Sequence, residues 1–468
     1  MENLFNGASW IWFTQQDAPD TYGDFTDRFI YDGGKVVCHL SCDSDYTLLV
    51  NGTFVSSNQY GDFEHYKIYD SIDITDYLVP GENSIFMTVW HFGIVSFRCR
   101  PAKAGLLYTV ECDGKALCQS GTHTLCRENP NYLGGYKKTI TAMMGQSFLF
   151  DATKPTDTPF YNSVIVNKSC KLFPRPIPKS RLLEPVAITL LKNEPDHYLV
   201  DLGEECVGLP TLDFDTEVPQ KITVAWGEHI LDGGVRRNPD NKDFSFEYIA
   251  KEGHNTYTNY MLRLGGRYLE VFCEAPIHLN YIGMIPQVYP VESVEKSFEN
   301  PQHQKIYDLC VKTLRLCLME HYVDTPWREQ CLYAFDARNQ MLCGYAAFRD
   351  GNSQYARANL LLISHDNRDD GLLSITFPCG SRMAIPSFSL HYVNAVREYI
   401  EHTGDVSLAL EVYPVVEKIM KVYEANIKDG LMYTFDVDNY WNFYDWSEYS
   451  DGSVRKYGAF AILLAIEK

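Results

Sequence analysis

The sequence predicts a multidomain protein in which two β-sandwich domains precede an all-α domain. The chain has 468 residues, more than one ordinary hydrophobic core contains, so about two to four domains are expected. From the N-terminus to about residue 295, apolar and polar residues alternate in short runs separated by turn residues, as in antiparallel strands. After about residue 297, apolar residues recur with the period of a helix.

The first predicted β-sandwich covers residues 1–175. Alternation is clear in the runs 45–55 and 83–90. The dipeptide Asn51-Gly52 lies between two such strands and is a strong signal for a type I′ hairpin turn. It also begins the sequon Asn51-Gly-Thr, but glycosylation requires export, so the turn is the preferred interpretation.

A proline-rich stretch, Phe173-Pro-Arg-Pro-Ile-Pro-Lys-Ser, follows the first domain. Prolines at this density hold the chain extended and are typical of a linker or domain edge. The second predicted β-sandwich, residues 180–295, contains strand patterns at 198–203, 221–228 and 265–272.

Residues 296–468 form the predicted helical domain. Gly404 is expected at the C′ position of the fourth helix, and Asp405 is expected to cap the fifth. The chain ends inside an apolar stretch, 458–468, where an amphipathic helix would need a further partner, so we expect the domain to be incomplete. The helical stretches are 302–320, 337–349, 352–364, 387–402, 406–426 and 457–468.

Composition and charge exclude several classes of function. The net charge of −20 argues against nucleic acid as a partner and favours a neutral substrate over an anionic one. The sequence has no run of eighteen apolar residues, so no membrane-spanning helix is expected. The N-terminus lacks the basic and apolar regions of a signal peptide, which favours a cytoplasmic location.

No pattern in the sequence indicates a metal or cofactor. The fourteen cysteines include no CxxC pair, and most are expected to be small buried apolar side chains rather than disulfides. His391 and His402 have no second ligand at metal-binding spacing, so both are interpreted as structural. Glycine-rich phosphate loops are absent, and we expect no cofactor.

The strongest candidate for chemistry is the segment Asp324-Thr-Pro-Trp-Arg-Glu-Gln-Cys-Leu-Tyr-Ala-Phe-Asp336, between the first two predicted helices. It brings four ionisable side chains together, those of Asp324, Arg328, Glu329 and Asp336. Loops on a rigid scaffold often carry function, and paired carboxyl groups are the groups that cleave glycosidic bonds.

A structural interpretation competes with this one. Asp324 and Asp336 could be helix N-caps, and Arg328 and Glu329 could be solvent-exposed. From the residues alone this interpretation is favoured, because charged clusters on protein surfaces are usually solvated.

The spacing Asp-x-Pro-x-Arg-Glu, with a second Asp seven residues after the Glu, resembles the signature of glycoside hydrolase family 78, the α-L-rhamnosidases. In that family two or more β-sandwich domains precede an (α/α)6 barrel, and the domain order here agrees. The run from Asn51 to Trp90 is similar to the family's N-terminal jelly-roll domain. The resemblance therefore implies two jelly-roll-like β-sandwiches and an (α/α)6-type barrel that is incomplete in this chain.

The resemblance also assigns roles. By position, Glu329 resembles the family's general acid, while Asp324, Arg328 and Asp336 resemble residues that hold the sugar hydroxyls. The indole of Trp327 is expected to add a face for sugar C–H groups.

Two departures from the family pattern affect the sugar pocket. Thr325 stands where the family more often has Cys, and Tyr333-Ala-Phe stands where a Gly-Trp-Thr-Gly run is usual. A glycosidase of the same fold that acts on another sugar is therefore an alternative.

A second candidate segment is Tyr440-Trp-Asn-Phe-Tyr-Asp-Trp446. The pair Asp445-Trp446 resembles the Asp-Trp pair on a barrel loop of the same family, and Trp441 is a further candidate for substrate binding. An aromatic core strand or hairpin is an equal alternative for this segment.

The resemblance implies hydrolysis with inversion of terminal α-L-rhamnosides. Glu329 would protonate the leaving oxygen, and the base would come from a barrel loop beyond the end of this chain, so the chain alone is expected to be inactive or weak. Arg328 is expected to face Asp324 or the sugar, because pairing with Glu329 would oppose its protonation.

The expected partner is a rhamnose-containing oligosaccharide or glycoside, with no nucleic acid and no membrane. A homodimer is a further expectation, since half a barrel exposes apolar surface. The alternative of a different class is a non-catalytic carbohydrate-binding protein built from the two β-sandwiches.

Overall fold

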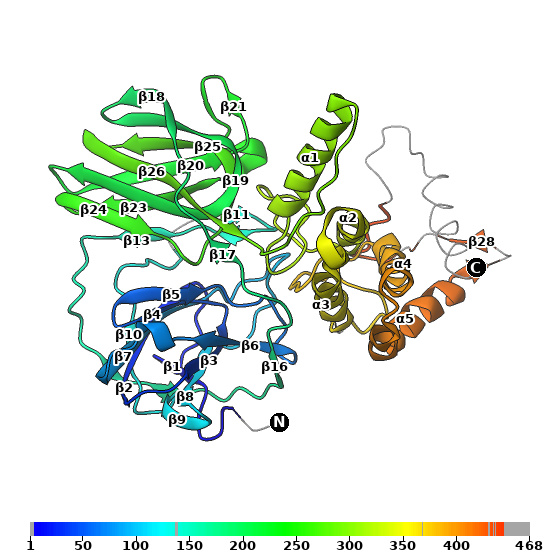
Figure 1. Cartoon of the computed structure of the whole chain (residues 1–468), viewed down its shortest axis with the longest axis horizontal. Coiled ribbons are helices and arrows are strands. Elements are labelled where there is room, and N and C mark those ends of the chain that lie inside the picture. The colour runs from blue at the N-terminus through cyan, green and yellow to red at the C-terminus, as the bar shows by residue number, and fades with distance from the viewer. Residues whose placement is uncertain are drawn as a thin grey trace.

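The structure is a computed structural model that describes residues 4–135, 139–366, 368–428, 431–433, 435 and 437–443. Figure 1 shows three parts: a blue β region from the start of the chain, a green β region, and a helical region in yellow to orange. The two β regions and the helices follow one another in the predicted order.

The first β region consists of two sheets around one core. Its strands are β1 (Ile11–Trp12), β2 (Thr21–Tyr31), β3 (Val36–Asp43), β4 (Asp45–Val50), β5 (Thr53–Ser57), β6 (Lys67–Asp73), β7 (Gly81–His91), β8 (Gly105–Cys112), β9 (Lys115–Gln119), β10 (Leu125–Glu128), β14 (Tyr161–Asn162), β15 (Val164–Ile165) and β16 (Leu172–Pro174). One sheet has the order β15-β1-β8-β3-β6-β16 with β9 paired to β8, and the other has the order β14-β10-β2-β7-β4-β5. Leu40 from the first sheet and Leu48 from the second are both fully buried in the shared core.

The predicted hairpin turn at Asn51-Gly52 is confirmed. Asn51 has φ 49° and Gly52 has φ 80°, and the flanking residues Val50 and Thr53 pair across β4 and β5. Two consecutive positive φ angles are what a type I′ turn requires, and Asn and Gly tolerate them best.

The second β region is a nine-stranded sheet that includes a strand from the first third of the chain. Its strands are β13 (Leu149–Asp151), β17 (Arg181–Leu182), β18 (Thr189–Glu194), β19 (His197–Thr216), β20 (Gln220–Gly227), β23 (Ser245–Ala250), β24 (Gly253–Thr258), β25 (Leu264–Cys273) and β26 (Ile277–Val288). The order is β13-β23-β20-β25-β19-β26-β17, with β18 and β24 paired to β19. Two short pairs accompany it, β11 (Thr139–Thr141) with β12 (Gly145–Gln146), and β21 (Ile230–Leu231) with β22 (Gly234–Val235).

Residues 139–151 therefore pack with the second β region, although their position in the sequence falls within 1–175. Strand β13 pairs in parallel with β23, and Ile140, Met144 and Phe148 are buried in the second core. The chain then returns to the first region through β14, β15 and β16. A short apolar run does not reveal which of two sheets it joins.

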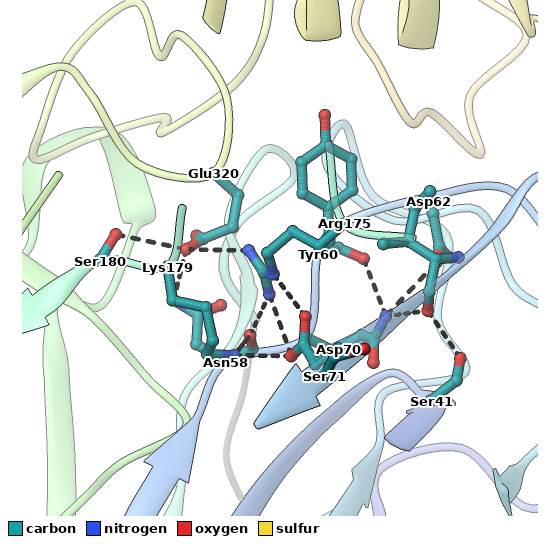
Figure 2. A network of polar contacts seen from close by, with 12 residues as sticks. Ser41, Asn58, Tyr60, Asp62, Asp70, Ser71, Arg175, Lys179, Ser180 and Glu320 are labelled. Atoms are coloured by element: carbon teal, nitrogen blue, oxygen red, sulfur yellow. Dashed lines mark hydrogen bonds and ion pairs between the residues drawn. The ribbon is translucent and has the colours of Figure 1, made fainter. Parts of the chain in front are cut away.

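Two cationic side chains of the proline-rich stretch bind one carboxylate of the first β region. Arg175 Nε lies 2.5 Å from one carboxylate oxygen of Asp70, and Lys179 Nζ lies 2.6 Å from the other. Asn58 Nδ2 donates to Glu320 Oε1 at 2.9 Å and so ties the first β region to the residues that follow the first helix. Figure 2 shows these side chains converging from the first β region, the proline-rich stretch and the segment after α1.

The helical region begins at α1 (Pro301–Leu316) and continues with α2 (Ala334–Ala347), α3 (Ser353–Ser364), α4 (Pro386–Thr403) and α5 (Val406–Ala425), followed by the short strands β27 (Ile427–Lys428) and β28 (Leu431–Met432). Five of the six predicted helices are confirmed, and the sixth, 457–468, lies outside the described residues. Gly404 adopts φ 71° after α4, and the Asp405 side chain accepts from the Ser407 N–H, both as predicted. No helix in the described part of the chain is long and apolar enough to cross a membrane.

The first β region packs directly on the helices. Tyr60, Phe63 and Ile68 of the first β region are buried in the same core as side chains of α2, α3 and α4. This packing places the end of α1 and the following loop at the junction of all three parts.

Candidate active site

The segment between α1 and α2 is a closed loop and not a helix terminus. The Asp324 N–H donates to the Cys331 carbonyl, and the Cys331 N–H donates to Asp324 Oδ1, both at 3.0 Å. Residues 326–329 form turns without helix, and Tyr333 is the N-cap residue of α2. Neither Asp324 nor Asp336 is therefore an N-cap residue, although Asp336 lies in the first turn of α2 and Arg328 is exposed, as the structural interpretation expects.

Gln330 holds the loop from within. Its Nε2 donates to the carbonyls of Pro326, at 2.8 Å, and Arg263, at 3.2 Å, while its Oε1 accepts from Arg98 Nη1 at 3.2 Å. Its backbone has φ 54°, which is uncommon for a non-glycine residue and turns the chain back after Glu329. One side chain thus ties the loop to both β regions.

A glycine on β25 allows the loop to approach the second sheet. A Cβ atom at Gly265 would lie 1.9 Å from the Pro326 carbonyl oxygen, well inside any allowed contact. Only a residue without a side chain fits between the strand and the loop at this point.

The acidic side chains of the loop are partly buried and influence one another. Burial, together with the negative charge of Glu329, raises the pKa of Asp324 to about 8. Burial also raises the pKa of Asp336 to about 6, and Glu329 again adds to the shift. The Tyr333 hydroxyl donates to Glu329 Oε2 at 2.8 Å and orients that carboxyl group. At neutral pH the cluster therefore retains a proton.

Arg328 is not among the groups that set the pKa of Asp324 or Asp336. Its side chain is exposed, and its positive charge acts on Glu228 at the end of β20, where it opposes the rise in pKa that burial causes. The pKa of Asp324, by contrast, is set by burial, the carboxylates and the loop backbone. The structure thus does not support the expected contact between Arg328 and Asp324.

Trp327 is an anchor of the loop rather than an open face. It is 3% exposed, belongs to the core of the second β region, and has its ring centroid 4.9 Å from that of Phe244. The prediction that Trp327 contacts a sugar is therefore corrected: the indole is covered by protein on the β-region side of the loop.

The second predicted segment is described as far as Phe443. The backbone N–H of Trp441 donates to the Ala384 carbonyl at 2.8 Å, and the residue is 38% exposed. An aromatic series joins it to the loop: the ring centroids of Tyr333 and Phe388 are 6.3 Å apart, those of Phe388 and Phe443 are 6.3 Å apart, and those of Phe443 and Trp441 are 4.7 Å apart. Trp441 is thus connected to Tyr333 through Phe388 and Phe443, while Asp445 and Trp446 lie outside the described residues.

Sequence reasoning overlooked several groups around the loop. Gln330 is not ionisable and stands among ionisable residues, and Arg98 and Arg263 come from distant connecting segments that carry no motif. Glu205 on β19 is a further acid near the loop, where burial and the charge of Glu228 raise its pKa to about 8. Only the pair Gly265-Gly266 could have indicated the site, because glycines within a strand often mark a place where another backbone approaches closely.

A family model, the bacterial α-L-rhamnosidase six-hairpin glycosidase domain, matches residues 295–460. No curated protein sequence matches the chain.

Solved structures agree with the family model. The rhamnosidase of glycoside hydrolase family 78 from Bacillus sp. GL1 matches with a TM-score of 0.85 and 18% identity, over 94% of this chain and 71% of that one. The α-L-rhamnosidase from Dictyoglumus thermophilum matches with a TM-score of 0.77 and 18% identity, over 99% of this chain and 55% of that one. The Streptomyces avermitilis α-L-rhamnosidase complexed with L-rhamnose matches with a TM-score of 0.73 and 16% identity, over 89% of this chain and 43% of that one.

The chain thus spans 71% of the first of these relatives and about half of the other two. The helical region of this chain thus matches the bacterial α-L-rhamnosidase six-hairpin glycosidase domain, and the chain as a whole has the fold of the glycoside hydrolase family 78 rhamnosidases.

Proposed function

We propose that this chain carries the acid half of the active site of a glycoside hydrolase that releases L-rhamnose from terminal α-L-rhamnosides. The observation that carries the proposal is a cluster of three partly buried carboxyl groups, those of Asp324 and Glu329 on the loop and that of Asp336 in the first turn of α2, within the residues matched by the rhamnosidase family model. Buried acids with raised pKa values on a loop are typical of catalytic sites rather than of surface charge.

Glu329 is proposed as the general acid. The Tyr333 hydroxyl holds one of its carboxylate oxygens, which leaves the other free for the leaving oxygen of the substrate. Asp324 keeps its proton at neutral pH, and a proton shared among neighbouring carboxyl groups is available for transfer to the aglycone.

Asp324 and Asp336 are proposed to hold sugar hydroxyls. The Cys331 N–H donates to Asp324 Oδ1, and the Thr325 N–H also bonds this carboxyl group, so the loop backbone fixes its position. Trp441, which is partly exposed, is proposed to pack against sugar C–H groups, with Asp445 and Trp446 as further contacts by family resemblance.

The proposed reaction inverts the anomeric configuration. Glu329 gives a proton to the glycosidic oxygen as the C–O bond breaks, and a base takes a proton from the water that attacks the opposite face. Such acid and base groups lie about 6.5–9.5 Å apart. By family resemblance the base comes from another loop of the barrel.

The test is hydrolysis of an aryl α-L-rhamnoside by the intact protein, compared with aryl β-D-glucoside and aryl α-L-fucoside. The proposal predicts a preference of at least about a hundredfold for the rhamnoside, with β-L-rhamnose as the first product seen by NMR. Equal rates on all three substrates would contradict the sugar assignment, and α-L-rhamnose as first product would contradict inversion. A protein that binds L-rhamnose but hydrolyses nothing would instead be a carbohydrate-binding protein.

A reducing compartment is proposed for the protein. All fourteen cysteines are free thiols, and eight of them are buried. Unpaired cysteines in this number support the cytoplasm, where disulfides seldom persist.

A further inference from the structure

A cavity of about 170 Å³ lies where the two β regions and the helical region meet. Gln330 and Leu332 form part of its wall, so it lies behind the catalytic loop, whereas Asp324, Glu329 and Asp336 do not line it. Its volume equals that of about five or six water molecules at roughly 30 Å³ each, or of one small organic molecule. Arg100, whose side chain is 40% exposed, lies at its outer edge.

Three deeply buried side chains of the cavity wall have a polar atom without a hydrogen-bond partner. These atoms are Tyr60 Oη, Arg263 Nε and Gln287 Oε1, and the three residues are 0%, 6% and 4% exposed. Figure 2 shows the Tyr60 hydroxyl pointing away from the polar network and toward the helices. Buried polar atoms are almost always paired, so three unpaired atoms around one cavity indicate a missing partner molecule.

Two guanidinium groups of the wall also have unused donors. Burial lowers the pKa of both Arg98 and Arg263, and within the described residues neither forms an ion pair. Arg98 Nη1 donates to Gln330 Oε1, and Arg263 Nη2 donates to the Leu316 carbonyl at 3.3 Å. The remaining guanidinium donors are available to oxygen atoms of a ligand.

The charges of the wall favour a neutral ligand. Four acids and four bases line the cavity, so the formal charges cancel. Burial raises the pKa of Asp45 to about 7, which neutralises part of one negative charge, and lowers the pKa of His321 to about 3, which leaves that ring neutral, so the wall stays close to neutral. An ion in the cavity would disturb this balance, whereas a hydroxyl group can both donate to carboxylates and accept from guanidinium groups. The charged residues are Asp43, Asp45, Asp62, Glu320, Lys67, Arg98, Arg100 and Arg263.

We propose that this cavity binds a neutral polyhydroxylated molecule about the size of one sugar ring, at a site separate from the carboxyl cluster. Trp90, Phe92 and Phe377 supply apolar faces for its C–H groups, and Tyr60, Arg263 and Gln287 supply the hydrogen bonds. Because Gln330 and Leu332 form part of the wall, a bound molecule contacts and stabilises the loop that carries Glu329. The proposal goes beyond rhamnoside hydrolysis and does not depend on it.

The experiment measures binding of L-rhamnose, D-glucose and glycerol, with sulfate as an anionic probe, by calorimetry on the intact protein. All variants carry Glu329→Gln and Asp336→Asn, which weaken binding at the loop. At least one neutral probe is expected to bind, and Tyr60→Phe and Gln287→Met should each weaken it about five- to tenfold. The melting temperature without probe should stay unchanged, since the removed atoms have no partner in the protein.

Tyr322→Phe is the matched control. The Tyr322 hydroxyl is also buried without a partner, but Tyr322 does not line the cavity, so this variant should bind as the parent does. The proposal is overturned if neither cavity variant changes binding, if sulfate binds more tightly than every neutral probe, or if probe-soaked crystals show only water in the cavity. Loss of hydrolysis in Glu329→Gln tests the proposed function alone and has no bearing on these outcomes.

Discussion

Tyr333 orients Glu329 through a single hydrogen bond of 2.8 Å. Tyr333→Phe keeps the ring and its packing on Phe388 but removes the donor. We expect kcat for a rhamnoside to fall about tenfold with little change in KM, because the lost bond affects proton transfer more than sugar binding.

Tyr345→Phe is the control for this substitution, measured in the same steady-state assay. The Tyr345 hydroxyl is buried in the helical region and has no hydrogen-bond partner, so its loss should leave kcat unchanged. An equal fall in kcat for both variants would show that the effect of Tyr333 is general to the helical region.

The protonation of Asp324 has a consequence for stability. Its carboxyl group keeps a proton up to about pH 8 in the folded chain, whereas an unfolded Asp loses it near pH 4. Between these values the folded state binds more protons, so this residue lowers stability as pH rises from about 4 to 8. Asp324→Asn removes this pH-dependent loss of stability and should raise the melting temperature at pH 8 relative to wild type.

The comparison is made at two pH values. At pH 5 the wild-type carboxyl group is already neutral in the folded chain, so the melting temperatures of Asp324→Asn and wild type should lie closer together than at pH 8. A constant difference at both pH values would mean that Asp324 does not titrate in this range.

At the scale of elements, the loop depends on a strand of another part of the chain. Gly265 on β25 leaves room for the Pro326 carbonyl, and a methyl group there would overlap it. Gly265→Ala should lower the free energy of unfolding by about 1–3 kcal/mol, and it should reduce activity by displacing the loop. Denaturant unfolding and rhamnoside hydrolysis measure the two effects.

Gly344→Ala in α2 provides the contrasting case. A Cβ atom there would meet Phe348 at an ordinary 3.6 Å, and alanine favours helix over glycine by about 0.5–1 kcal/mol. This variant should be as stable as wild type or more so. If Gly265→Ala were as stable as wild type, the result would contradict the close approach of β25 to the loop.

The sequence was sufficient to predict elements with a strong local pattern. The five described helices, the Asn51-Gly52 turn and the Asp405 cap follow from periodicity and capping chemistry, which act over a few residues. The parallel pairing of β13 with β23 could not be predicted, because it depends on contacts between residues about a hundred positions apart. The end of α1 at Leu316, before the predicted 320, follows from the bridge between Leu318 and Tyr322.

The site was predictable in part for the same reason. Asp324, Glu329 and Asp336 lie within thirteen residues, on the loop and the first turn of α2, so their proximity is local. The orientation of Arg328 toward Glu228 and the burial of Trp327 depend on where the second β region packs, which no spacing within the loop encodes.

At the scale of the whole molecule, a buried charge cluster fixes the arrangement of the parts. Asp70 is 1% exposed and binds both Arg175 and Lys179 of the proline-rich stretch. Asp70→Asn should cost about 3–5 kcal/mol, because two cations would remain without their full partner in the interior. The pKa of Asp70 lies well below its usual range owing to these cations, so the stabilisation is present above about pH 4 and is lost in acid.

Asp73→Asn on the same strand is the control. Asp73 pairs with Lys35 at 3.3 Å, but both side chains are more than half exposed, and such pairs contribute about 0–1 kcal/mol. Guanidinium unfolding of the two variants should therefore differ by several kcal/mol. Equal stabilities would contradict the role of the buried cluster in joining the parts.

The most direct test of the account is the effect of Glu329→Gln on two substrates that differ in their need for an acid. With a natural rhamnosyl disaccharide, the intact variant should lose about 10²–10⁴-fold in kcat/KM, whereas an aryl rhamnoside with a good leaving group should lose far less. Glu292→Gln, at an exposed pair with Arg349, should be unchanged on both. Wild-type turnover of the disaccharide by Glu329→Gln would contradict the assignment of Glu329 as the proton donor.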